Sequence, residues 1–222
     1  MSEHVAPGPA ASTKISWGER LAALSGAASF VLAFAGISFA EHGGKGLSPD
    51  QPTAANGAGF ARYAGEAWVG ATLMMASVAL SLVFLGPLWS RLQRGAGWLA
   101  VVAVAGGIAG AVLLLESAMF AIAAAVAGDV GDAQTARTLL VFEWESARLG
   151  VAPALATVAA ATVAGFRHSI FPRWFSWLSL VFSVVLVIAL LPVGPAGLLG
   201  SVGALWILIA SLVLALGRDS GR

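Results

Sequence analysis

The chain has 222 residues, of which 59% are hydrophobic and 10% are charged, with a formal net charge of +1. Soluble domains carry about 25% charged residues, so this composition predicts a chain solvated mostly by lipid. No basic run is dense enough to follow a nucleic-acid backbone, and the lack of cysteine excludes disulfides, thiolate catalysis and Cys-ligated metal centres.

Six apolar stretches predict an all-α, polytopic bundle of transmembrane helices in the cell membrane. At about 1.5 Å per residue, such stretches cross a hydrocarbon core of roughly 30 Å. Residues 1–19, rich in Ala, Pro and Ser, are expected to form a disordered cytoplasmic tail, and residues 218–222 a second cytoplasmic tail. Within the transmembrane domain 20–217, the expected spans are residues 21–40, 67–90, 98–126, 143–166, 174–191 and 197–216.

The first apolar stretch could also be a cleavable signal peptide rather than a transmembrane span. Ser38-Phe39-Ala40 precedes Glu41 and has the small residues of a signal-peptide cleavage site, but the apolar region of a signal peptide is usually about 7–15 residues, shorter than this run. The polar stretch from Glu41 to Glu66 is expected to be a loop outside the cell. The span that follows it would run inward.

Proline and small residues mark breaks and contacts within the later spans. Pro192 to Pro195 cannot continue a helix and should separate the fifth span from the sixth, and Pro153 should kink the fourth near its charged end. Gly106 and Gly110 form a Gly-x-x-x-Gly pattern in the third span, which is typical of a close helix–helix contact. A second seam is expected along the fourth span at Ala152, Ala156, Ala160 and Ala164.

The orientation follows from Lys and Arg residues near the ends of the spans, which cluster on the cytoplasmic side of membrane proteins. Eight lie on one side of the six-span arrangement and three on the other, which predicts both termini inside. The eight are Lys14, Arg20, Arg91, Arg94, Arg167, Arg173, Arg218 and Arg222, and the three are Lys45, Arg62 and Arg137.

Charged residues within spans are the first candidates for function, because they are costly in hydrocarbon. Glu116 in the third span and Arg148 in the fourth are each 18 residues from the expected inner edge, so they should lie at matching depth. Glu145 lies three residues before Arg148 on the same helix face, and Glu143 is close by. This charge cluster fixes the register of the two spans, handles a substrate, ion or proton, or lies so near the membrane interface that its side chains are simply hydrated.

Glu41, His42 and Glu66 are expected on the outer face, near the same cluster. Their spacing matches no metal signature, so neither a metal nor another cofactor is predicted. The other two histidines, His4 and His168, lie outside the spans, which argues against haem ligation.

Four segments resemble an uncharacterised bacterial six-span integral-membrane family, known only as a domain of unknown function. They are Phe84-Leu85-Gly86-Pro87-Leu88, the pair Gly107 and Glu116, the pattern Glu143-Trp144-x3-Arg148, and Ile170-Phe171-Pro172-Arg173-Trp174-x2-Trp177. Phe171 and Ser176 depart from the family's usual form of the last segment. The resemblance implies the six-span topology and supplies no activity, cofactor or catalytic residue.

Two functional hypotheses remain. In the first, the protein is a non-catalytic membrane component or accessory subunit, whose partners are the lipid bilayer and either a second copy or another membrane protein. In the second, it is a small transporter or channel with its charged site around Glu116 and Arg148. An intramembrane enzyme is not expected, because no His, Cys, Ser–Lys or paired-Asp arrangement stands at mid-membrane depth.

Reporter fusions test the expected topology. Fusions after Gly57, Gly131 or Gly194 should report the outside of the cell, and fusions after Gly95 or Ser169 the cytoplasm, because of the distribution of basic residues. An inverted result at Gly131 and Ser169 would contradict the six-span arrangement.

Overall fold

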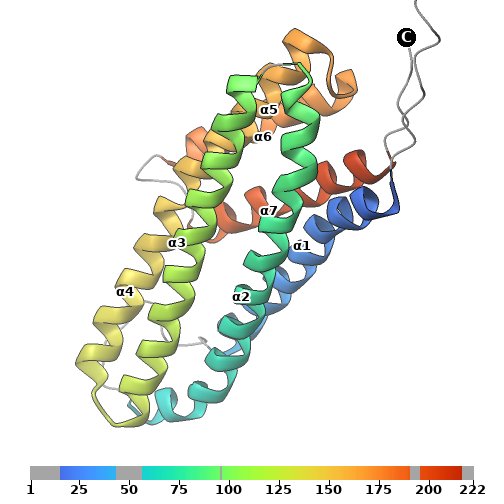
Figure 1. Ribbon diagram of the computed structural model, residues 1–222. Coiled ribbons are helices and arrows are strands. Elements are labelled where there is room, and N and C mark those ends of the chain that lie inside the picture. Colours follow the sequence, from blue (N-terminus) through green and yellow to red (C-terminus); the bar gives the residue numbers. More distant parts are fainter. Residues whose placement is uncertain (1–15, 44–56, 96, 191–195, 217–222) are drawn as a thin grey trace, which may run out of the picture.

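The structure is a computed structural model that describes residues 16–43, 57–95, 97–190 and 196–216. The described part is entirely helical and contains no strand. Long helices run side by side, and α1 and α7 cross them obliquely (Figure 1). The helices are α1 (Trp17–Gly43), α2 (Gly57–Gln93), α3 (Gly97–Asp129), α4 (Ala133–Leu149), α5 (Val151–His168), α6 (Arg173–Ala189) and α7 (Ala196–Leu216).

Short turns connect the successive helices from α3 to α6. Between α3 and α4, Gly131 adopts a φ of +83°, a left-handed conformation that suits glycine, and Asp132 caps α4 by accepting a hydrogen bond from the Thr135 amide at 3.0 Å. After α5, Ser169 has a φ of 52° and its amide donates to the Gly165 carbonyl. Pro172 then stands at the N-cap of α6, where its missing amide costs no helical bond.

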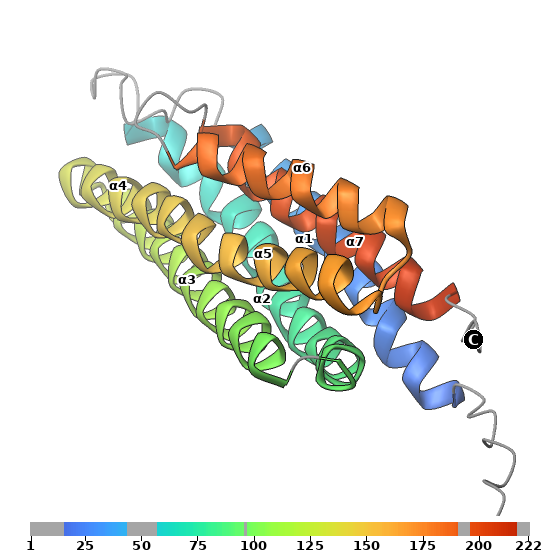
Figure 2. The ribbon, with the colours of Figure 1, turned by 90° about the horizontal axis from the view of Figure 1, so that it is seen from above.

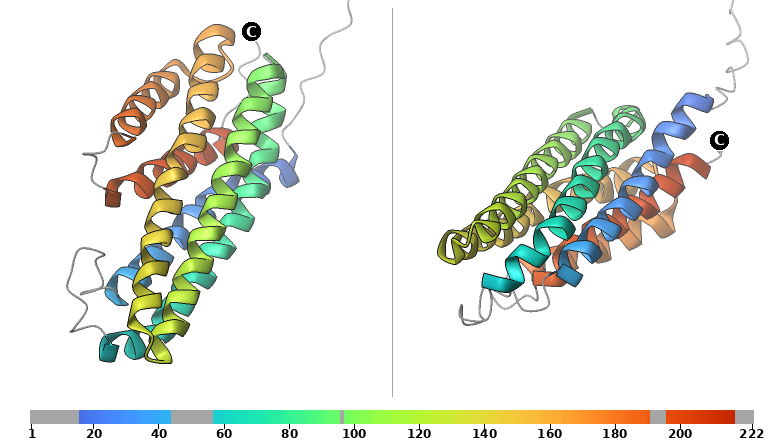
Figure 3. Two further views of the ribbon diagram at one scale, coloured as in Figure 1. Left: turned by 90° about the vertical axis from the view of Figure 1, so that its left-hand side faces the viewer. Right: turned by 90° about the horizontal axis from the view of Figure 1, so that it is seen from below.

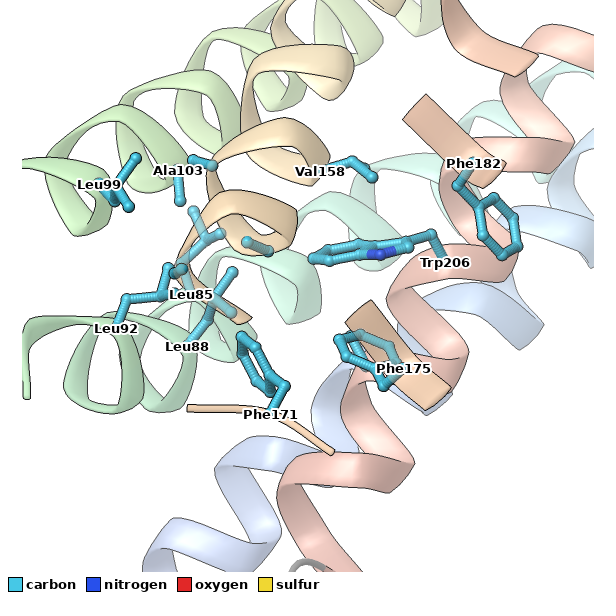
Figure 4. Close-up of a cluster of buried hydrophobic side chains, with 14 of the residues drawn as sticks. Leu85, Leu88, Leu92, Leu99, Ala103, Val158, Phe171, Phe175, Phe182 and Trp206 are labelled. Atoms are coloured by element: carbon cyan, nitrogen blue, oxygen red, sulfur yellow. The ribbon is translucent and has the colours of Figure 1, made fainter. Parts of the chain in front are cut away.

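The core lies where α2, α3, α5, α6 and α7 meet. Leu85, Leu88 and Leu92 of α2 extend toward it, and the indole of Trp206 lies near Val158 of α5 and Phe175 of α6 (Figure 4). Trp206 is 1% exposed, and its Nε1 donates a 2.9 Å hydrogen bond to the Ser179 hydroxyl. The polar end of this large side chain is therefore satisfied on the α6 side, as a buried tryptophan requires.

Small residues allow close contact between helices at several points. An atom in the position of a Cβ on Gly106 would lie 2.6 Å from the backbone oxygen of Pro153, and one on Gly36 would lie 2.9 Å from that of Gly70. Thr157 adds a hydrogen bond across the first contact, donating to the Ala103 carbonyl at 2.9 Å. The close contact predicted at Gly106 is thus formed between α3 and α5.

A serine of α7 joins the backbone of α1. The Ser211 hydroxyl donates to the Ala23 carbonyl and accepts a 3.0 Å hydrogen bond from the Ala27 amide. In an uninterrupted helix the Ala27 amide would donate directly to the Ala23 carbonyl. Here the Ser211 hydroxyl stands between these two groups and bridges them. Gly26 makes room, because a Cβ there would meet both Phe84 and Ser211. Figure 2 shows α1 and α7 running alongside each other.

Four stretches of the described chain are long and apolar enough to cross a membrane, which indicates a membrane protein. They are Trp17–Phe39, Gly65–Gln93, Gly97–Asp129 and Ala133–His168, the last combining α4 and α5. The other two apolar helices, Arg173–Ala189 and Val202–Leu216, are shorter. Many large apolar side chains point outward, among them Val101, Met119 and Val181, each more than half exposed.

The helices differ from the expected spans mainly at their ends. Residues 57–66, expected within a loop, form the start of α2, and α4 begins at Ala133 rather than near Leu139 or Glu143. Both additions contain charged residues, Arg62 and Glu66 in the first and Arg137 in the second, which lower their hydropathy. The sequence predicts a kink near Pro153, and there α4 is divided from α5 at Gly150, because Pro153 has no amide to bond the Leu149 carbonyl. The predicted break from Pro192 to Pro195 and both tails lie outside the described residues.

The contact at Gly106 predicts a specific sensitivity. Gly106→Ala should lower the free energy of unfolding by about 1–3 kcal/mol, because the methyl group meets a backbone oxygen that cannot move independently. Gly86→Ala is the matched control, since an added Cβ there meets nothing within 4 Å and only helix propensity changes. Thermal unfolding in detergent measures both, and equal stability of the two variants would contradict the close packing of α3 on α5.

Candidate functional site

The predicted charge cluster falls on the hairpin of α3 and α4, which run side by side at one edge of the bundle (Figures 1 and 2). Only Ala136 and Ser146 are fully buried in α4, and Phe142 of α4 stacks on Phe120 of α3 with ring centroids 5.5 Å apart. Among the described helices, α4 packs mainly on α3. Much of its surface therefore faces away from the bundle.

Arg148 forms an ion pair with Glu145 one turn earlier on α4. The closest guanidinium nitrogen and carboxylate oxygen are 4.0 Å apart, and the side chains are 39% and 57% exposed. Trp144, which shares this face, is 46% exposed. The pair therefore lies on the outer surface of α4, where ion pairs contribute little to stability.

Glu116 lies on the side of α3 that faces away from its neighbours. Ser117 and Ala118, the next two residues, are 1% exposed and pack inward, whereas Val112 and Met119, which share the face of Glu116, are 57% and 66% exposed. Among the described residues, no ion pair joins Glu116 to Arg148. The sequence predicts that Glu116 and Arg148 lie at the same depth in the membrane. In the structure, each side chain points away from the interface between α3 and α4.

Glu143 is the member of the cluster on the packed face of α4. It lies two turns after the fully buried Ala136 and three residues before Ser146, and it is itself partly buried. Within the described part of the chain, its carboxyl group makes no hydrogen bond or ion pair. The structure thus separates Glu143, facing α3, from the surface pair of Glu145 and Arg148.

The three outer-face residues are described only in part. Glu66 is exposed on α2, while the side chains of Glu41 and His42, in the last turn of α1, lie outside the described part. Among the residues described, no group of three or more His, Asp or Glu side chains could hold a metal ion. The nearby Asp132 titrates below its ordinary range, since hydrogen bonds from the side chain and the backbone of Thr135 lower the pKa of its carboxyl group.

Sequence reasoning missed a cavity of about 160 Å³ between the helices, which is partly open at its edge, where the lining residues Leu114 and Ala147 are exposed. Residues of α1, α2, α3, α4, α5 and α7 line it, and none of them is ionisable. Its polar side chains are Ser29, Ser77, Ser81 and Thr157, together with the indole of Trp206. The signal available in the sequence is the glycine-rich stretch of α3, where Gly106, Gly107 and Gly110 all line the cavity. The Gly-x-x-x-Gly pattern in this stretch predicts close packing rather than open space.

Comparisons of this chain with protein-family models, curated proteins and solved structures find no match. The resemblance to a six-span bacterial family therefore stays a prediction. What the site can do has to be argued from its own geometry.

The arrangement of the charges predicts two different coupling energies. In double-mutant cycles of thermal unfolding, Glu145→Gln with Arg148→Met should give a coupling of about 0.2–1 kcal/mol, as exposed ion pairs do. The cycle of Glu116→Gln with Arg148→Met should give a coupling close to zero, because these side chains do not meet. A Glu116–Arg148 coupling larger than that of Glu145 with Arg148 would contradict the placement described above.

Proposed function

We propose that the chain is a six-span protein of the cell membrane with both termini in the cytoplasm, acting as a non-catalytic component of a larger membrane assembly. The basic residues near the span ends support the orientation. The four long apolar stretches and two shorter apolar helices support the number of spans. In this arrangement the α3–α4 hairpin points outward, and Glu116 lies in the outer half of the bilayer.

The position of Glu116 carries the proposal. Charged side chains within spans nearly always face a bundle interior or a water-filled cavity, yet Glu116 is exposed beside Val112 and Met119. Ten further residues, Ser117 to Val126, continue the apolar span beyond it, so it does not stand at the end of the helix. A carboxyl group in this position is best accommodated when a helix of another subunit supplies a hydrogen-bond donor.

The separation of charge from cavity favours this role over transport. A site that carries ions or polar solutes needs polar groups facing a continuous path through the bundle. The interior cavity has no ionisable lining residue, and Glu116, Glu145 and Arg148 lie on the outside of their helices. The charges are therefore placed to contact a neighbouring subunit.

Replacing Glu116 tests the proposed association. In gently solubilised membranes of the native cell, the wild-type chain should migrate in an assembly larger than its own 22.4 kDa. Glu116→Leu should reduce the association constant about three- to thirtyfold, since an interhelical hydrogen bond in a membrane contributes about 0.6–2 kcal/mol. Val112→Leu is the matched control, because it alters the same exposed face without removing the carboxyl group.

Two outcomes would contradict the proposal. One is an unchanged assembled fraction for Glu116→Leu. The other is saturable ion or solute flux by the purified wild type in liposomes that a folded Glu116→Leu/Arg148→Met double variant abolishes, which would favour the transporter alternative.

A further inference from the structure

The hydroxyl groups around the interior cavity are already used within the protein. Ser77 donates to the Ser29 carbonyl at 2.8 Å, and the two serine hydroxyls lie 3.0 Å apart. Ser81 donates to the Val78 carbonyl at 2.7 Å, and Thr157 to the Ala103 carbonyl at 2.9 Å. No buried side-chain nitrogen or oxygen of the described residues lacks a partner. The hydroxyl groups of the lining therefore do not require hydrogen bonds from a polar ligand.

Water is also a poor occupant of this space. A buried water molecule needs about 2–4 polar partners, whereas most of the lining consists of Ala, Gly, Leu, Ile, Val and Phe side chains. Apolar cavities of about 150 Å³ stay dry and take up molecules of the size of benzene. The cavity here has a volume of about 160 Å³, which is in the same range.

Two residues define the shape of the site. Gly110 lines the cavity, and a Cβ added to it would meet no atom within 4 Å, so open space begins directly at its backbone. Trp206 forms part of the wall from α7 while its N–H is bound to Ser179 of α6. Figure 3 shows the long α3 and α4–α5 on one side and the oblique α1 and α7 on the other. Residues of both groups line the cavity, together with residues of α2.

We propose that this cavity is a binding site for an apolar ligand of about the size of benzene, either a free apolar molecule dissolved in the membrane or a segment of a lipid hydrocarbon chain. Its chemistry selects hydrocarbon, because every lining hydroxyl is bound within the protein and no charge is available to a polar ligand. The proposal does not depend on the association through Glu116, which concerns the outer surface of α3.

Trp206 provides the measurement. It is the fully buried tryptophan of the described chain, so a variant that keeps it alone reports on the cavity. The seven tryptophans to be replaced by Phe are Trp17, Trp68, Trp89, Trp98, Trp144, Trp174 and Trp177. In one arm the protein is placed in bilayers of phosphatidylcholine with brominated chains, which quench tryptophan on contact. In the other, bromobenzene is titrated into the protein in detergent.

Filling the cavity is the decisive comparison. Gly110→Leu should restore Trp206 fluorescence in whichever arm shows quenching, whereas Gly86→Leu should leave the quenching unchanged, because Gly86 has equally open space but lies outside the cavity. A chain that keeps Trp144 alone should be quenched by brominated lipid in all variants, since that residue is 46% exposed. Gly110→Val replaces Gly110→Leu if the larger residue prevents folding, as judged by size-exclusion chromatography.

The arms also distinguish the two sources of hydrocarbon. Quenching by brominated lipid that Gly110→Leu removes identifies a lipid chain, and saturable quenching by bromobenzene alone identifies a small free molecule. Absence of quenching at Trp206 in both arms would overturn the proposal. Equal quenching in the Gly110→Leu and Gly86→Leu proteins would overturn it as well.

Discussion

The close approach of α3 to α5 is the constraint on which most of this structure depends. At Gly106 the two backbones come so near that no side chain fits, and the hydroxyl of Thr157 donates to the Ala103 carbonyl across the contact. In a membrane, helices gain nothing from exchanging lipid for apolar neighbours, so packing contacts and interhelical hydrogen bonds of this kind decide which helices associate. Val158 of α5 and Trp206 of α7 then belong to the same buried core, while α7 packs mainly along α1.

The same contact explains why a cavity lies beside a tightly packed seam. The backbone of α5 occupies the space beside Gly106, where a Cβ atom would stand. Gly110, one turn further along α3, has no atom within 4 Å of its Cβ position. Further along α3, beside Leu113, the chain of α4 and α5 is interrupted at Gly150, where Pro153 leaves the Leu149 carbonyl without its helical donor. Gly110 and Ala111 of α3, Ala147 of α4 and Ala154 of α5 line the cavity here, and their small size leaves this space unfilled.

The sequence predicted the helical class, the contact at Gly106 and a disturbance of the helix near Pro153, because each depends on a local property such as hydropathy, side-chain size or the missing amide of proline. It did not predict the start of α4, since Gln134, Thr135 and Arg137 make that helix amphipathic and hide it from a hydropathy profile. It gave Glu116 and Arg148 the same depth but not their directions, which depend on which face of each helix packs inward. The cavity was beyond sequence reasoning, because a glycine facing a neighbour and a glycine facing open space look identical in a pattern.

Serine and threonine have a particular importance in this bundle. Three buried hydroxyls join two helices while leaving no polar atom without a partner: Ser77 joins α2 to α1, Thr157 joins α5 to α3, and Ser211 joins α7 to α1. These bonds fix the relative positions of the helices without the cost of burying a charge. The interior consequently remains apolar, and the ionisable side chains of the α3–α4 hairpin are left on its periphery or, for Glu143, at the interface between α3 and α4. A bundle organised in this way keeps the chemistry of its interior and the chemistry of its surface independent, so a ligand in the cavity and a protein partner on α3 would be recognised by entirely different forces.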